Sequence, residues 1–328
     1  MKKAIYFFSL FFLFVFVSCK SARNVTATTP IVLNSIDTVR KDEPVKAIIE
    51  TADTIKKSDT VHKSDIAALN TNITRTIKNV SNKGVERIVN YDFSHPDVPE
   101  SFDGFRIAFI SDLHYESLLK EEGLKDLVRL LIELKPDVLL MGGDYQEGCQ
   151  FVKSLFKEIA RVNPPMGIYG VLGNNDYERC HDEIVHTMEQ YGMHVLEHKT
   201  DTLRKDGQQI IIAGVRNPFD RANMKSPTLA LSPQDFVVLL VHTPDYVEDV
   251  CVNNTDLALA GHTHGGQVRM LGVTPVLNSR YGKRFLTGLA YNSFRIPLIV
   301  TNGIGTSRMP IRAGAPAEIV MVTLYKQK

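Results

Sequence analysis

The stretch "FRIAFISDLHYESLLKEEGLKDLVRLLIELKPDVLLMGGD", residues 105–144, decides the fold class. It opens with an apolar run typical of a strand, and apolar residues then recur at helical spacing over residues 121–135. A second apolar run, residues 137–143, closes it. Two strands separated by a helix predict a parallel pair joined by a helical crossover, so the stretch indicates an α/β protein.

The same alternation continues along the chain. Apolar residues are spaced as in helices in residues 151–162, 183–191 and 244–252. Strand-like runs occupy residues 167–173, 208–215, 236–242 and 256–261. Two later runs, residues 295–303 and 317–326, have no helix of comparable length between them, so part of the sheet is expected to be antiparallel.

Five of these predicted strands are followed within three residues by side chains that can bind a metal ion. In chain order these side chains are Asp112, His114, Asp144, Asn174, His242, His262 and His264. In an open α/β sheet, ligands bind outside the carboxyl ends of the strands. The seven side chains are therefore expected to converge on one crevice.

Each of these residues could also have a purely structural role. Asp144 and Asn174 could be turn residues, and Thr243 followed by Pro244 is a good helix start, with threonine as N-cap. A single histidine at the end of a buried strand, such as His242, is more often a satisfied core residue than a ligand. The ordered recurrence of such residues after five strands is what favours a metal site.

His262 and His264 are two residues apart and would point the same way from a strand, while the neighbouring glycines would let the backbone approach a ligand. Two carboxylates, four imidazoles, one amide oxygen and no thiolate exclude a cysteine-type structural zinc site. They favour Mn, Fe, Zn or Co. Seven ligands suit two divalent ions that share a carboxylate, and such a pair activates a bridging hydroxide for in-line attack at phosphorus.

Taken in order, D-x-H, G-D, G-N-x-D, H and G-H-x-H resemble the calcineurin-like metallophosphoesterase superfamily, from residue 105 to the C-terminus. "GHTHGGQV" (residues 261–268) and "GIGTSRMPIRAGAPAEI" (residues 303–319) resemble its bacterial, membrane-associated branch. That branch includes phosphodiesterases and UDP-2,3-diacylglucosamine hydrolases. The resemblance implies a two-sheet sandwich of mixed parallel and antiparallel strands, flanked by helices.

The resemblance also implies roles for individual residues. One metal ion is expected to be held by Asp112, His114 and His264, and the other by Asn174, His242 and His262. Asp144 is expected to bridge the two ions, and Asp144, His264 and Asn175 are the candidate catalytic residues.

Asn175 occupies the place where most of the family has a histidine. An asparagine can donate a hydrogen bond to a phosphoryl oxygen but cannot deliver a proton to a leaving group. The lost acid catalysis is most costly for a basic alkoxide and least costly for a phosphate leaving group. We therefore expect a phosphodiester or pyrophosphate substrate, lipid-linked in view of the export signal described below, rather than a simple monoester.

Other assignments remain open at this stage. Arg308 and Arg312 could bind an anionic head group, or could form salt bridges at the surface or core edge. Alternative functions are a UDP-2,3-diacylglucosamine hydrolase proper and a catalytically weak, metal-binding envelope lipoprotein. A nuclease is disfavoured because 38 Lys and Arg balance 37 Asp and Glu, without interleaved aromatic and basic residues. We expect a monomer that binds no nucleic acid.

The N-terminal region predicts export. Residues 1–19 combine a cationic start, an apolar run and a final cysteine, which resembles a bacterial lipoprotein signal with Cys19 as the lipidated residue. An ordinary cleaved signal or an uncleaved anchor are the alternatives. Residues 20–84 are polar and predict a flexible linker, which leaves residues 85–328 as the catalytic domain at the cell envelope. The other cysteines, Cys149, Cys180 and Cys251, indicate neither a zinc site nor a full disulfide framework.

Overall fold

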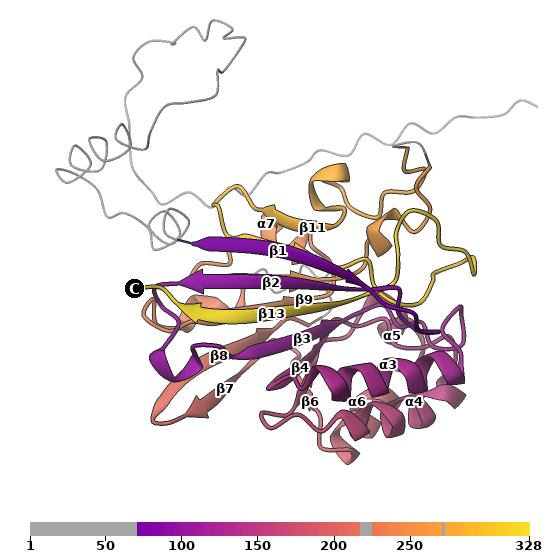
Figure 1. Cartoon of the computed structure of the whole chain (residues 1–328), viewed down its shortest axis with the longest axis horizontal. Coiled ribbons are helices and arrows are strands. Elements are labelled where there is room, and N and C mark those ends of the chain that lie inside the picture. The colour runs from indigo at the N-terminus through magenta and orange to yellow at the C-terminus, as the bar shows by residue number, and fades with distance from the viewer. Residues whose placement is uncertain (1–70, 217–224, 271–272) are drawn as a thin grey trace, which may run out of the picture. The chain divides into compact units, whose positions relative to one another are not determined.

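The computed structural model describes residues 71–216, 225–270 and 273–328 (Figure 1). The predicted signal peptide, Cys19 and residues 20–70 of the predicted linker lie outside the described residues. Among the helices that are described, none combines the length and apolar character needed to cross a membrane.

Two β-sheets form the centre of the fold. The first has the strand order β1-β2-β13-β3-β4-β5-β6, and the second has the order β11-β12-β10-β9-β8-β7. The strands of the first sheet are β1 (Asn72–Asn79), β2 (Arg87–His95), β13 (Glu318–Lys326), β3 (Arg106–Ile110), β4 (Val138–Met141), β5 (Ile168–Gly170) and β6 (His194–Val195). Those of the second are β11 (Gly288–Tyr291), β12 (Pro297–Val300), β10 (Leu257–Ala260), β9 (Val237–Val241), β8 (Gln208–Gly214) and β7 (Lys199–Lys205).

The described helices are short. The α-helices are α3 (Glu121–Leu134), α4 (Val152–Ile159), α5 (Asn174–Arg179), α6 (His181–Gln190) and α7 (Tyr246–Asp249). Single turns of 3-10 helix are η3 (Glu100–Phe102), η4 (Cys149–Phe151), η5 (Ala160–Val162), η7 (Pro227–Ala230), η8 (His264–Gly266) and η9 (Gly282–Phe285). In Figure 1, α3, α4 and α6 lie together at the lower right of the molecule.

Alternating side chains of β3 show how the layers are built. Ala108 and Ile110 belong to a core that includes Leu127 of α3, whereas Ile107 and Phe109 belong to a core that includes side chains of the second sheet. This period of two is what a strand covered on both faces requires. A third core packs α7 against the other face of the second sheet. The predicted two-sheet α/β sandwich is therefore confirmed.

Strand directions also agree with the sequence. β3, β4, β5 and β6 are parallel neighbours, as are β8, β9, β10 and β12. The expected antiparallel pairs lie near the C-terminus, where β13 pairs with β3 and β11 pairs with β12. The carboxyl ends of the parallel strands of each sheet consequently lie at one edge of that sheet.

The predicted start of the folded domain at residue 85 is wrong. Residues 72–79, assigned above to the linker, form β1, which pairs with β2 over its whole length. Nearly all side chains of β1 are exposed, so its backbone hydrogen bonds rather than apolar burial hold it in place. Contacts between residues assign the described residues to one compact unit, within residues 60–328. Because this unit contains both sheets and all three cores, we expect it to fold without residues 1–59.

The helix predicted for residues 244–252 is also shorter than expected, because α7 makes only one turn, Tyr246–Asp249. Thr243 does not cap it, and Asp245 takes the N-cap position instead. The Asp245 carboxylate accepts hydrogen bonds from the Ser279 hydroxyl (2.5 Å) and the Arg280 backbone (2.8 Å). These contacts tie the start of α7 to a distant loop.

Two of the three downstream cysteines form a disulfide between Cys149 and Cys180, and Cys251 is a thiol. The bond joins η4, which follows the loop after β4, to the residue that ends α5. Asp144 lies in the loop after β4 and Asn174 begins α5, so the disulfide links two segments that carry predicted site residues. The cysteine spacing alone gave no indication of this pairing.

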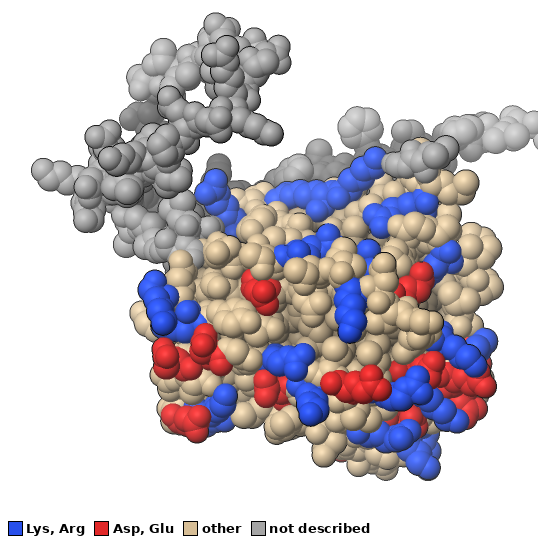
Figure 2. All heavy atoms as spheres, viewed as in Figure 1, with Lys and Arg blue, Asp and Glu red and all other residues tan. Residues whose placement is uncertain are grey.

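Charged side chains of both signs alternate on the outer helical surface. On α3, Lys125 pairs with Glu121 (2.5 Å) and Arg129 pairs with Asp126 (2.9 Å). Figure 2 shows basic and acidic side chains next to one another over this part of the molecule. Exposed pairs of this kind contribute little stability, which comes instead from the buried cores.

Candidate metal centre

The loops after β3 and β4 run side by side and carry three of the predicted ligands. The backbone N–H of Asp112 donates to the Gly143 carbonyl (2.9 Å), and that of His114 donates to the Asp144 carbonyl (3.0 Å). Asp112, His114 and Asp144 have φ angles of 52°, 38° and 55°. Positive φ is unusual for residues with a side chain, and the paired loops hold these three in that strained conformation.

The second sheet contributes three histidines. His242 directly follows β9, whereas His262 and His264 lie in the loop after β10, with φ angles of 68° and 53°. The expectation that His262 and His264 point the same way from a strand is wrong. β10 ends at Ala260, and the left-handed backbone turns the two side chains into different groups.

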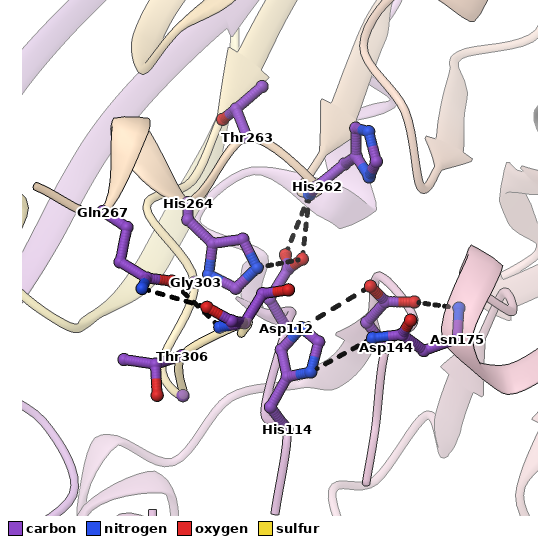
Figure 3. A network of polar contacts seen from close by, with 12 residues as sticks. Asp112, His114, Asp144, Asn175, His262, Thr263, His264, Gln267, Gly303 and Thr306 are labelled. Carbon is purple, nitrogen blue, oxygen red and sulfur yellow. Dashed lines mark hydrogen bonds and ion pairs between the residues drawn. The ribbon is translucent and has the colours of Figure 1, made fainter. Parts of the chain in front are cut away.

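The histidines and carboxylates form two adjacent groups. Asp112, His114 and His264 make one group, and Asp144, His242 and His262 make the other, each with its ligand atoms within 4.8 Å of one another. The Asp144 Oδ2 atom lies 3.5 Å from His114 Nε2 and also 3.5 Å from His242 Nε2. Asp144 therefore lies between the two groups. Figure 3 shows Asp112, His114, Asp144 and His264 directed at a common centre.

Both asparagines at the start of α5 reach this centre. The Asn174 Oδ1 atom is 3.2 Å from His242 Nε2. The Asn175 backbone donates to Asp144 Oδ1 (3.0 Å), and its side-chain Nδ2 lies 3.3 Å from His114 Nδ1 (Figure 3). All seven ligands predicted from the sequence, together with Asn175, are thus brought into one site.

Two hydrogen bonds orient the imidazoles. His242 Nδ1 donates to the Gly142 carbonyl (2.7 Å), and His114 Nδ1 contacts Glu147 Oε1 (2.5 Å). In each ring the Nε2 atom is left facing the centre, where that of His114 has no hydrogen-bond partner among the described residues. An outer partner on one ring nitrogen is the usual device for presenting the other to a metal. Sequence reasoning missed Glu147.

The charges of the site are strongly coupled. Burial acts to raise the pKa of Asp144, but the nearby His242 and His114 outweigh it and hold the pKa below the usual range. Burial acts to lower the pKa of His242, but the carboxylates of Asp144 and Asp112 outweigh it and raise this pKa to about 10. Burial and the neighbouring His242 lower the pKa of His262 to about 3. Burial likewise holds the pKa of His264 well below its ordinary value.

These protonation states fit divalent cations. His262 and His264 are neutral, which is the form that ligates a metal, and Asp144 is ionised. The proton that the carboxylates hold on His242 compensates buried negative charge, a task that a divalent cation would take over. The donor atoms are oxygens and imidazole nitrogens without a thiolate, as Mn, Fe, Zn or Co prefer.

Gly173 makes the close approach of the two sheets feasible. A Cβ atom at this position would lie 2.1 Å from Asp144 Oδ1 and 2.7 Å from His242 Cε1. Any side chain here would push a predicted ligand out of place. A glycine is therefore needed before Asn174 because a side chain would displace the ligands, and not because the backbone conformation of the turn demands it.

Asp176 links the loop of Asp144 to the loop of Gly173, a role that sequence reasoning did not assign. Its buried carboxylate accepts hydrogen bonds from the backbones of Asp144 (2.7 Å), Tyr145 (2.9 Å) and Gly173 (2.8 Å). Burial raises its pKa to about 7. An acidic residue at the third position of a helix is a recognisable capping signal, but the link to the Asp144 loop is a tertiary contact.

The two candidate substrate-binding arginines have different environments. Arg308 is exposed at the mouth of the site and forms no ion pair with any of the described residues. Arg312 is committed to backbone carbonyls rather than to a carboxylate. Its guanidinium donates to the carbonyls of Asn302 (2.8 Å), Gly305 (2.9 Å) and Ala315 (2.8 Å), and Nη2 lies 3.4 Å from His264 Nδ1. Arg312 therefore positions the His264 loop.

A polar cavity of about 190 Å³ opens over the centre. Its walls are formed by Asp144, Asn174, His262, His264, Asn278, Ser307 and Arg308. Within the described part of these walls, every group that titrates, apart from Arg308, is a predicted metal ligand. No uncommitted carboxyl or imidazole is available here to protonate a leaving group.

The chain is similar in sequence to bacterial metallophosphoesterases. A model of the calcineurin-like phosphoesterase family matches residues 105–266. The metallophosphoesterase YkuE of Bacillus subtilis is 30% identical over 69% of this chain and 81% of its own length. The phosphodiesterase YaeI of Escherichia coli is 31% identical over 67% and 82%. Among solved structures, the NAD nucleotidase NadN of Haemophilus influenzae matches with a TM-score of 0.44 and 17% identity, over 61% of this chain and 45% of that one.

Proposed function

Because this chain belongs to the calcineurin-like phosphoesterase family and is a metal-dependent phosphoester hydrolase, we propose that it uses two divalent ions to hydrolyse phosphodiesters or pyrophosphates at the cell envelope. The observation that carries the proposal is the place of Asp144, whose Oδ2 atom is 3.5 Å from an imidazole of each ligand group. A carboxylate shared in this way suits a pair of ions.

One ion would be held by Asp112, His114 and His264. The other would be held by Asn174, His242 and His262, and Asp144 would bind both. When bound, such ions polarise a phosphoryl oxygen and lower the pKa of water. The protein supplies the orientation: Glu147 and Gly142 fix the rings of His114 and His242. Asp144, His264 and Asn175 are the residues we expect to contribute to catalysis, because Asp144 and His264 line the cavity and Asn175 contacts both Asp144 and His114.

The preference for diesters or pyrophosphates rests on Asn175 and the cavity walls. The Asn175 amide can donate a hydrogen bond to phosphate but cannot protonate a leaving oxygen. No other uncommitted acid lines the described walls of the cavity, which are listed above. A leaving group that needs no proton is therefore favoured, such as the phosphate of a lipid-linked pyrophosphate or the weakly basic alcohol of an activated phosphodiester.

The envelope location is supported by the sequence of residues 1–19 and by the Cys149–Cys180 disulfide. Disulfides persist in exported proteins and are rare in the reducing cytosol. We propose a lipoprotein anchored through Cys19, which would hold the hydrolase near lipid-linked substrates.

The test is hydrolysis of bis-p-nitrophenyl phosphate and of p-nitrophenyl phosphate by residues 60–328 loaded with Mn²⁺, with bound metal measured in the same samples. We expect two ions per chain and turnover that favours the diester. Asp144→Ala should lose both the turnover and the second ion. Asn175→His should raise the rate of monoester hydrolysis about 10²-fold, because histidine can donate a proton to the leaving group.

Three results would contradict the proposal, in whole or in part. One ion per chain at saturation would exclude the two-ion centre. Two ions without turnover of either ester would point instead to a metal-binding envelope protein. Faster monoester than diester hydrolysis by the natural chain would remove only the substrate preference.

A further inference from the structure

An apolar pocket of about 190 Å³ adjoins the polar cavity of the metal centre. Val268, Pro275, Val276 and Met309 form its apolar walls. The pocket and the polar cavity share His264, Asn278, Ser307 and Arg308. Because the two cavities share these residues, one molecule could place an apolar group in the pocket and a phosphate at the metal centre.

The apolar residues of this pocket are not packed as core residues are. Val276 and Met309 are 50% and 57% exposed, although both are large apolar side chains. Neighbouring large apolar side chains exposed together mark binding sites more often than chance exposure. Neither residue belongs to one of the three hydrophobic cores, so the fold does not require them to be apolar.

A second cavity, of about 460 Å³, shares Arg308 and Met309 with the apolar pocket. Its polar lining consists of Glu116, Ser117, Lys120, Glu147 and Thr306, beside Met309 and Pro310. Lys120 is already paired with the Glu116 carboxylate (3.1 Å), so this cavity offers hydrogen bonds rather than a net positive charge. Arg308 lines all three cavities and has no acidic partner among the described residues.

We propose that the pocket of Val268, Pro275, Val276 and Met309 binds the hydrocarbon group of the substrate, and that the substrate is an amphiphilic, activated phosphodiester, in which one ester oxygen belongs to a weakly basic leaving group. Its phosphate lies at the metal centre beside Arg308, whose single charge matches that of a diester. Its neutral polar group lies toward Lys120 and Ser117. This inference rests on the proposed function and adds to it the place and chemical class of both substituents.

The experiment compares the binding of dimethyl phosphate and methyl octyl phosphate to residues 60–328 loaded with Mn²⁺, by calorimetry and below the micelle concentration. Both probes carry only basic leaving groups and are therefore expected to bind without turnover. Burial of one methylene tightens binding about fourfold, so three buried methylenes predict about sixtyfold tighter binding of the octyl compound.

Matched variants locate the effect. Val276→Asn and Met309→Gln should each reduce the preference for the octyl compound at least about fivefold, because a polar group replaces buried apolar contact. Val273→Asn is the control, since Val273 lies close in sequence, is 63% exposed and does not line the pocket. It should bind both compounds as the natural chain does.

Equal affinity for the two phosphates would overturn the inference, as would an octyl preference that all three variants keep. A dimer that dissociates in Val276→Asn during sedimentation would assign the apolar face to a second copy and also overturn it. Octyl preference without any metal-dependent hydrolysis of bis-p-nitrophenyl phosphate would sustain the pocket and refute the proposed activity. The two failures are therefore distinguishable.

Discussion

Replacing Asp176 by asparagine tests whether this carboxylate sets the geometry of the metal centre. One carboxylate oxygen accepts the backbone N–H groups of Asp144 (2.7 Å) and Gly173 (2.8 Å), and the other accepts that of Tyr145 (2.9 Å). Asparagine has nearly the same shape and can keep the first oxygen in place. Its NH₂ group must then face the Tyr145 N–H, so one buried donor loses its acceptor.

The size of the effect follows from two opposing contributions. A hydrogen bond to a charged group contributes about 1.5–3 kcal/mol, and a buried donor without an acceptor adds a penalty of similar size. Burial of the Asp176 carboxylate is itself costly, since it raises the pKa to about 7, and a neutral amide avoids part of that cost. We therefore expect a loss of about 2 kcal/mol in the free energy of unfolding.

The assay is urea unfolding of metal-free residues 60–328, followed by metal binding and diester hydrolysis in the same variant. The Tyr145 backbone next to Asp144 would lose its anchor, and outer contacts of this kind change metal affinity or activity by about 10–100-fold. Asp182→Asn is the control, because that side chain is fully exposed on α6. An Asp176→Asn chain within about 0.5 kcal/mol of the natural stability and within twofold of its activity would refute the reasoning.

Two further predictions concern neighbouring contacts. Glu147→Gln should weaken metal binding at the His114 group about tenfold, because an amide holds the imidazole less firmly than a carboxylate; competition with a chelator measures this, and unchanged affinity would contradict the role given to Glu147. Replacing Cys149 and Cys180 by serine opens a loop with a sequence separation of 31, which should lower the free energy of unfolding by about 3.5 kcal/mol. Urea unfolding with and without a reductant checks this, since only the natural chain should respond to the reductant.

The sequence predicted the strands of the core and all seven candidate ligands because both depend on local patterns. A fully buried parallel strand must be a continuous apolar run, as in β9 and β10, and the first polar residue after it must lie at the edge of the sheet. Residues such as His242 could therefore be placed from their neighbours alone. By contrast, β1 is polar and exposed, and only its pairing with β2 makes it a strand.

The parts of the site that could not be predicted are those in which residues far apart in sequence meet outside regular structure. Alternation places side chains correctly only while the backbone is extended, and at His262 and His264 it is left-handed, so two histidines two apart reach different groups. Arg312 is committed to carbonyls of its own loop, a contact that no spacing shows. The apolar pocket follows the same rule, because Val276 and Met309 come from two irregular loops and become one surface only in the folded chain. Substrate selectivity in this protein is therefore expected to reside in its loops, while the β-sheets fix the chemistry.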